Sequence, residues 1–465
     1  MAGRADRTSR ALARLKAPNP AAPVTEALRI PELDERQVFR AMNLAMRIGE
    51  LLLSGGAGAG DITATMRAVT GAAGLEKCEA DVTYTVISIS YLRAADSAPI
   101  TGSRFVRRYG FDGTRLSRVH EVVDALTRGE MDVATAQERI DEIRRAAHPY
   151  PRWITTAAWG GLAAAVAVLL GGGVIVVGTA FLSTVVIDRV NRLLTARQVP
   201  FFYQFALGGA VATSAAIALA ALGLQVNSSL VIASGIVAML PGGLFVGSVQ
   251  DAIGGFLVTA AARALEVFVL TAGLLTGIAL ALDVGRRLGV RISADDLDGS
   301  SLALPVRVLA AAAAAGLYAV ANYAPRRVIL SAMIIGGVGF GLHDGLAAGG
   351  VSATTATAGA AIAMGIACHA VAGRVRIAPL LLVVPAIVPQ LPGLLVFRGL
   401  QAVTGGQTAG GFSLLLSAVT VGFALAAGIL FGELIAQPGH RESSRLERRR
   451  GPRLIGPLRR VKRSS

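Results

Sequence analysis

The chain has 465 residues, of which 53% are apolar and only 16% charged, and its mean hydropathy is +0.58. These values exclude an ordinary soluble protein and indicate many membrane-spanning segments. The formal charge of +15 does not call for a nucleic-acid partner, because the basic residues lie mostly in the tails and short loops, as the positive-inside rule predicts.

Residues 1–33 are basic and contain three prolines in 18–23, with little apolar periodicity, so we expect a disordered tail. No basic stretch leads into a short apolar core, and we therefore expect no cleaved signal peptide.

Residues 34–152 are expected to form a small cytoplasmic α+β domain. Asp34 is suited to cap a helix that runs through Leu53, because the apolar residues that follow it form a helical stripe. The remaining predicted elements of this domain are helices at 62–70, 115–128 and 133–147 and strands at 82–92 (VTYTVISISYL) and 101–109.

The segment SGGAGAGD, residues 54–61, separates the first two predicted helices. It lacks the Lys of a phosphate-binding loop and the pattern of a nucleophile elbow. We interpret it as a helix–helix turn with Asp61 as an N-cap, and a small-ligand or catalytic role remains the alternative. No cofactor or metal motif is visible, and we expect the chain not to be an enzyme.

Long apolar runs begin at Trp153 and predict about ten transmembrane helices. The expected spans are 153–170, 174–194, 201–222, 228–248, 264–282, 302–322, 328–347, 351–371, 378–397 and 410–432.

Two stretches of these spans resemble each other. Residues 240–255 read LPGGLFVGSVQDAIGG and residues 391–406 read LPGLLVFRGLQAVTGG, identical in seven of sixteen columns at a spacing of 151. The same offset lays the first five spans on the last five. We therefore expect two five-helix repeats, 153–285 and 302–435, joined by a linker at 286–301.

Five is an odd number, so the second repeat enters the membrane from the opposite face, which gives an inverted repeat typical of secondary transporters. The segments expected inside carry eight Arg and those outside four, and the tail 436–465 is strongly basic. We expect both termini to be cytoplasmic and the basic tail to lie on anionic lipid. The oligomeric state stays open, a homo-oligomer included. Cys78 and Cys368 are too far apart in this topology to form a disulfide.

Each Leu-Pro-Gly is expected to break its helix and leave backbone groups free to hold a small zwitterion, although it also suits a simple helix end. Polar residues near the breaks add neutral hydrogen-bonding groups. The candidate substrate-binding residues are Pro241, Gly242, Gly243, Gln250, Pro392, Gly393, Gln401, Thr354 and Thr355. The Thr residues are equally suited to bond the carbonyls of their own helix.

Ionisable residues within apolar spans are costly and invite a functional interpretation. Asp251 follows Gln250, whereas its repeat mate is Ala402, and Arg263 and Glu266 lie on one helical face and are suited to neutralise each other. The candidates for proton coupling are Asp251, Glu266, Asp344 and His369. A structural ion pair is the alternative for each.

The SGGAGAGD segment followed by Met66 and Gly74-Leu75, the VTYTVISIS strand, the YPRW approach to the first span and the Leu-Pro-Gly at 240–242 together resemble the threonine/serine exporter family. The resemblance covers roughly residues 35–435. It implies an inner-membrane carrier with a cytoplasmic N-terminal domain that exports small hydroxy amino acids at the expense of the proton motive force. A small-solute channel and a membrane-anchored hydrolase or sensor are the alternative functions.

Overall fold

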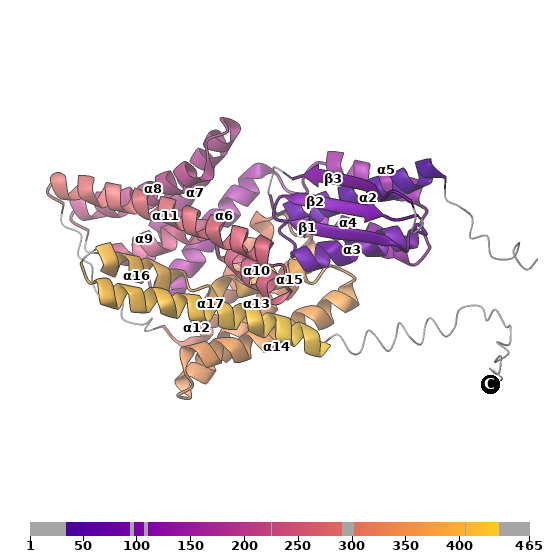
Figure 1. Ribbon diagram of the computed structural model, residues 1–465. Coiled ribbons are helices and arrows are strands. Elements are labelled where there is room, and N and C mark those ends of the chain that lie inside the picture. Colours follow the sequence, from indigo (N-terminus) through magenta and orange to yellow (C-terminus); the bar gives the residue numbers. More distant parts are fainter. Residues whose placement is uncertain are drawn as a thin grey trace, which may run out of the picture.

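The computed structural model describes residues 34–93, 97–106, 110–224, 226–290, 302–404 and 406–436. An N-terminal domain with a small sheet lies at one end of a large helical bundle (Figure 1). The expected tail at 1–33, the expected tail at 436–465 except Ala436, and most of the expected linker at 286–301 lie outside these residues.

Within the described residues the N-terminal domain contains four helices and three strands, and nearly all of them were expected. The helices are α2 (Glu35–Ser54), α3 (Ala59–Ala72), α4 (Gly113–Thr127) and α5 (Val133–Arg145), and the antiparallel sheet has the order β1 (Cys78–Thr83), β2 (Val86–Tyr91), β3 (Ile100–Phe105). Asp34 caps α2 in a capping box with Gln37. Alternate residues of β1 are buried beneath the helices.

Two expectations about this domain were wrong. The stretch 82–92 is not one strand, because the chain turns at Tyr84, whose φ is +52°, and pairs Thr83 with Val86. The β-branched residues on both sides of the turn conceal it in the sequence. Asp61 is not the N-cap of α3 either; Gly58 is, and Asp61 lies within the first turn, where the helix dipole favours a carboxylate.

The helical bundle contains eight helices that are long and apolar enough to cross a membrane, or nine when one bent pair is counted as a span, within the described residues. The long ones are α6 (Arg152–Leu169), α7 (Val174–Ala196), α8 (Phe201–Ala221), α11 (Leu257–Arg287), α12 (Leu304–Ala321), α13 (Arg326–Ala348), α14 (Ala353–Val375) and α17 (Thr408–Ala436). The number differs from ten because both Leu-Pro-Gly segments divide a span into short pieces.

Both breaks have the same form. The first passes from α9 (Ser228–Ile236) through the 3-10 turn η2 (Val237–Met239) to α10 (Gly242–Ile253), with a bend of 55°. The second passes from α15 (Leu380–Ile387) through η3 (Val388–Gln390) to α16 (Gly393–Thr404). Proline lacks the amide that would continue the helix, which explains why each helix stops before it.

The helix starts recur along the chain at a nearly constant offset. α6, α7 and α8 begin 152 residues before α12, α13 and α14, and α10 and α11 begin 151 residues before α16 and α17. The two breaks also meet in space. A Cβ on Gly242 would lie only 2.5 Å from Leu391 Cδ1, so the absence of a side chain at Gly242 permits this approach.

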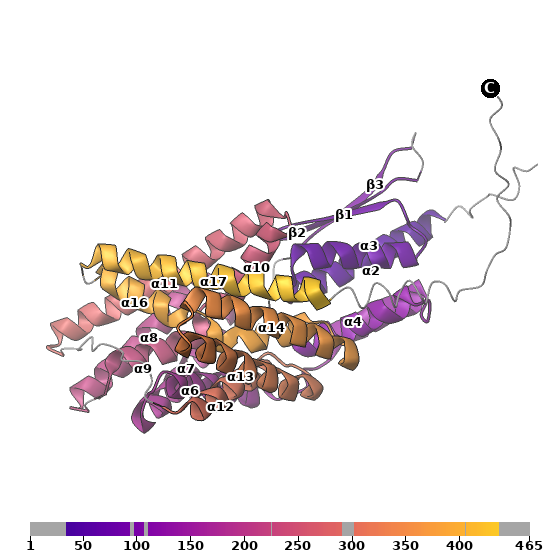
Figure 2. The same cartoon turned by 90° about the horizontal axis from the view of Figure 1, so that it is seen from below.

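The N-terminal domain docks against both halves of the bundle (Figures 1 and 2). The amide of Gly113, at the start of α4, donates to the carbonyl of Asn322 at 2.9 Å, and Arg327 pairs with Glu121. On the first half, Tyr84 N donates to Thr259 Oγ1 of α11 at 3.1 Å, and Thr259 Oγ1 donates to Val82 O at the same distance. The domain is therefore packed on the bundle and not tethered beside it.

Candidate functional site

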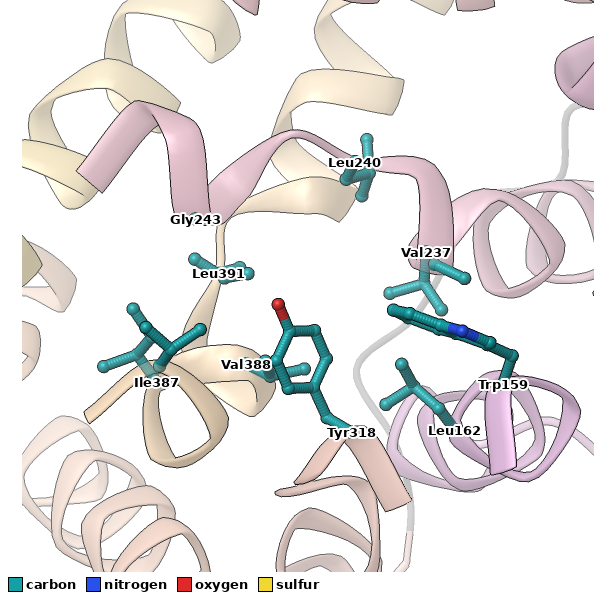
Figure 3. Close-up of a pocket in the computed structure, with 11 residues that line it drawn as sticks. Trp159, Leu162, Val237, Leu240, Gly243, Tyr318, Ile387, Val388 and Leu391 are labelled. Atoms are coloured by element: carbon teal, nitrogen blue, oxygen red, sulfur yellow. The ribbon is translucent and has the colours of Figure 1, made fainter. Parts of the chain in front are cut away.

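The two broken helices enclose a small cavity in the interior of the bundle. It measures about 80 Å³ and lies where α6 and α12 approach η2, α10, α15 and η3 (Figure 3). Most of its lining side chains are apolar, apart from the Trp159 indole N–H and the Tyr318 hydroxyl. The lining residues are Trp159, Leu162, Val237, Ala238, Leu240, Gly243, Tyr318, Val384, Ile387, Val388 and Leu391. Residues from both halves of the chain thus line one cavity at the level of the breaks.

Backbone groups give this apolar cavity its polarity. The first amides of an α-helix have no acceptor one turn earlier, and these amides carry the positive end of the helix dipole. α10 begins at Gly242, and Gly243 lines the cavity. The 3-10 turns η2 and η3 end at the same cavity, where the carbonyls of Val237 and Val388 accept hydrogen bonds from the amides of Leu240 and Leu391. The start of one helix and the ends of two turns thus meet at the cavity, and helix starts and ends carry opposite partial charges.

Two aromatic residues in the wall were not among the sequence candidates. Trp159 of α6 and Tyr318 of α12 pack edge to face, with ring centroids 5.6 Å apart at 84°. The chain has only two Trp and seven Tyr, and both residues lie inside apolar spans. The rarity of Trp and Tyr was the signal that could have identified these two residues as candidates. The span pattern alone, however, does not show which helices face each other.

The structure brings only part of the predicted substrate set to the cavity. Gly243 lines it, and Pro241, Gly242 and Pro392 form the breaks beside it. Gln250 lies in the last turns of α10, and Thr354 and Thr355 begin α14, where Ser352 accepts a hydrogen bond from the Thr355 amide. These three do not line the cavity. The surroundings of Gly393 and the side chain of Gln401 lie outside what the structure describes.

A second polar site lies at the other end of α10, beneath the N-terminal domain. The Asp251 side chain is 2% exposed and pairs with Arg263 of α11 at 2.7 Å. Asp251 Oδ1 also accepts a hydrogen bond from the amide of Ala59 at 2.8 Å, and Arg263 donates to the carbonyl of Ala57 at 3.0 Å. The segment 54–61 therefore clamps onto a buried ion pair of the bundle.

The expected pairing of Arg263 with Glu266 is replaced by this clamp. Glu266 instead accepts a hydrogen bond from the Tyr84 hydroxyl at 3.3 Å. Both acidic candidates of this region, Asp251 and Glu266, thus contact the N-terminal domain. The sequence does not indicate these contacts, because Ala59 lies 192 residues from Asp251 and Tyr84 lies 182 residues from Glu266.

Asp61 brings a second carboxylate to the clamp. A Cβ on Gly58 would lie 3.5 Å from Asp251 Oδ1 and 3.8 Å from Asp61 Oδ2, so both carboxylates flank the same glycine. Desolvation of the carboxylate by the surrounding protein, followed by the charges of Glu433 and Asp251, raises the pKa of Asp61 to about 6, and the charge of His369 acts in the opposite direction. His369 Nε2 lies 3.2 Å from Glu433 Oε1. We call Asp61, Asp251, Arg263, His369 and Glu433 the charged cluster.

Asp344 lies apart from the charged cluster. Its carboxylate forms two hydrogen bonds with the Arg307 guanidinium, at 2.8 and 2.5 Å, between the start of α12 and the end of α13. Because α12 ends and α13 begins at the N-terminal domain, this pair lies at the opposite end of the bundle. The four coupling candidates thus divide into a group of three near the domain and one far from it.

The segment 54–61 has no visible catalytic arrangement. The Ser54 hydroxyl donates to the carbonyl of Leu51 at 3.0 Å, and the amide and carbonyl groups of Ala59 and Ala57 are engaged by the clamp. The segment is thus a docking element between α2 and the bundle.

Several apolar helices and a cavity between two broken ones define a multi-pass membrane protein of the kind that carries small solutes. Residues 43–285 match a family model described as "Putative threonine/serine exporter", and residues 307–435 match a second, "Threonine/Serine exporter, ThrE". The chain belongs to the threonine/serine exporter family, which is a family of transporters and not of enzymes.

Two relatives illustrate the extent of the similarity. A "Probable threonine/serine exporter" of Mycobacterium tuberculosis is 36% identical over 414 residues, covering 87% of this chain and 78% of the relative. A "Threonine/serine exporter" of Corynebacterium glutamicum is 33% identical over 431 residues, covering 90% and 86%. No solved structure matches the chain.

Proposed function

We propose that the protein is a secondary active transporter that exports threonine, serine or similar small amino acids from the cell, driven by the proton motive force. The observation that carries this proposal is the cavity between the two broken helices, which is lined by both halves of the chain. The names of the relatives supply the substrate class, because both are threonine/serine exporters.

The substrate would bind in the cavity with its charged groups on the helix ends. The carboxylate suits the amides in the first turn of α10 from Gly243 onward, since the Gly242 amide already donates to the Leu240 carbonyl, and the ammonium group suits the carbonyls at the ends of η2 and η3. Burying an unpaired charge is costly, so these backbone dipoles would offset the desolvation of the zwitterion.

We further propose that the two halves form an inverted repeat. The recurring helix starts support this interpretation, since each half then has five helical units and an odd number reverses the direction of the second. Rocking of one half against the other would open the cavity alternately to the two sides. The positive-inside rule favours cytoplasmic termini, with the tail at 436–465 on anionic lipid.

Proton coupling would act through α10, because this helix joins the two sites. Its second residue, Gly243, lines the cavity, and Asp251 of the charged cluster lies eight residues, or about 12 Å, further along the helix. The N-terminal domain clamps the Asp251 end. Release of this clamp would free α10 to move and change access to the cavity.

Protonation would control the clamp by the repulsion among its carboxylates. The charges of Glu433 and Asp251 act on Asp61. Arg263 pairs with Asp251 and His369 pairs with Glu433, so the cluster has three carboxylates and two basic groups. A proton on Asp61 removes like-charge repulsion and favours docking, and its loss to the cytoplasm favours release. Protons that enter the cell through the carrier would thus return the clamp to its docked state after each export step.

Counterflow in proteoliposomes tests the carrier. Vesicles loaded with unlabelled threonine should take up external labelled threonine transiently above its equilibrium level, because a carrier exchanges its bound substrate. A channel would let the label equilibrate without this overshoot. Flux that lacks counterflow and saturation would therefore overturn the proposal in favour of a channel.

A further inference from the structure

Tyr318 presents the hydroxyl group of its side chain to the central cavity. Its ring rises from α12 into the cavity, and the oxygen points toward the chain near Gly243 and Leu391 (Figure 3). The edge-to-face contact with Trp159 at 5.6 Å fixes the plane of the ring. The hydroxyl therefore has a set position beside the two breaks.

This hydroxyl has no hydrogen-bond partner in the described part of the chain. Tyr318 is half-buried and lines the cavity, and tyrosine hydroxyls in such places usually find a partner. Other side chains of the wall, among them Leu162, Val388 and Leu391, are apolar. A ligand in the cavity is thus the natural partner of the Tyr318 oxygen.

The chemistry of the wall indicates which part of a ligand meets Tyr318. On the proposed function, the helix ends hold the carboxylate and ammonium groups, which are charged and match the helix dipoles better than a neutral phenol does. The remaining polar group of threonine or serine is its side-chain hydroxyl. A phenol both donates and accepts a hydrogen bond, as that hydroxyl does, and the apolar wall suits the threonine methyl group.

We propose that Tyr318 recognises the side-chain hydroxyl of the substrate and so selects β-hydroxy amino acids over their isosteres. This inference rests on the proposed function. Sites built to bond a hydroxyl reject analogues without it, because the protein group is then left unpaired. Valine, which replaces the threonine hydroxyl by a methyl group, is the informative competitor.

The test compares wild type with Tyr318→Phe. Inhibition of labelled threonine counterflow by threonine, valine, serine and alanine gives the relative affinities. We expect wild type to prefer threonine over valine, and Tyr318→Phe to lose about tenfold of this preference, with valine affinity kept or improved. Tyr203→Phe is the matched control, because Tyr203 is 60% exposed on α8.

Two results would overturn the inference. One is an unchanged threonine-to-valine ratio in Tyr318→Phe, whether both affinities stay the same or fall equally, and the other is a wild type that does not distinguish the two amino acids. If wild type transports no amino acid, the proposed function fails; calorimetric binding of threonine and valine to the same purified proteins then decides the Tyr318 inference separately. Thermal unfolding in detergent verifies that Tyr318→Phe is folded.

Discussion

The carboxylate of Asp251 accepts a hydrogen bond from the backbone amide of Ala59 at 2.8 Å, although the two residues lie 192 positions apart. The bond joins the N-terminal domain to the half of the broken helix that begins at the cavity. Arg263 completes the contact by pairing with Asp251 and donating to Ala57. One short helix therefore connects a predicted substrate site with a domain outside the bundle.

Removing the charge of Asp251 should loosen this contact. Asp251→Asn leaves the buried Arg263 without its carboxylate, and breaking a buried ion pair in this way typically costs about 3–5 kcal/mol. We expect faster limited proteolysis within residues 54–61 and a loss of pH-dependent transport in a folded bundle. Asp283→Asn is the control, because Asp283 forms exposed ion pairs. Wild-type transport by Asp251→Asn would remove this residue from the mechanism.

Asp61 should give docking a defined pH dependence. Its pKa in the docked structure is about 6, above the ordinary value of 3.8, so the docked state binds the proton more tightly than a released segment does. Docking therefore weakens as pH rises from about 4 to about 6 and no longer depends on this group above that range. Hydrogen exchange of residues 54–61, measured at pH 5 and pH 7.5, should show more protection at pH 5.

Asp61→Asn should abolish most of this difference in protection, since the amide stays neutral at both pH values. Glu138→Gln provides the control, as Glu138 is exposed on α5 and away from the charged cluster. Equal pH dependence in wild type and Asp61→Asn would show that another group governs docking.

The break at Pro241 should matter for transport. Pro241→Ala restores a backbone donor and relaxes the constraint on φ, which changes the conformational balance at the bend by on the order of 1 kcal/mol and the rate by about fivefold. Pro305→Ala is a matched control, because Pro305 lies in the first turn of α12, where proline fits a helix. Equal rates for Pro241→Ala and wild type would favour simple helix termination.

Two adjacent glycines should respond differently to the same substitution. A Cβ on Gly242 would meet Leu391 at 2.5 Å, so Gly242→Ala should lower the thermal unfolding temperature through overpacking of about 1–3 kcal/mol. A Cβ on Gly243 would meet nothing within 4 Å, so Gly243→Ala should stay stable but bind threonine more weakly, because the methyl group occupies the cavity. Similar unfolding temperatures for both variants would contradict the contact between the breaks.

The sequence predicted the helices well where local signals were strong. The capping box at Asp34, the apolar runs of the long helices and the two proline breaks are all local features, and the structure has them. The turn at Tyr84 was hidden because the residues around it favour strands throughout. The N-cap of α3 was misplaced because Gly58 has no side chain to mark it.

The candidate site was less accessible to sequence reasoning because its contacts are long-range. Asp251 stood out as an acid in an apolar region, but its bond to Ala59 and its pairing with Arg263 depend on how the domain docks. Likewise Tyr318 and Trp159 meet only when α6 and α12 pack together. Periodicity identifies the helices but does not determine which residues meet across them.

Efflux of preloaded labelled threonine from proteoliposomes, with and without an imposed proton gradient, tests the central claim most directly. We predict saturable efflux that accelerates several-fold when the side that receives threonine is acidic, and that loses this acceleration when the gradient is collapsed by a protonophore. Efflux at the same rate with and without the gradient, from correctly oriented and folded protein, would contradict proton-driven export.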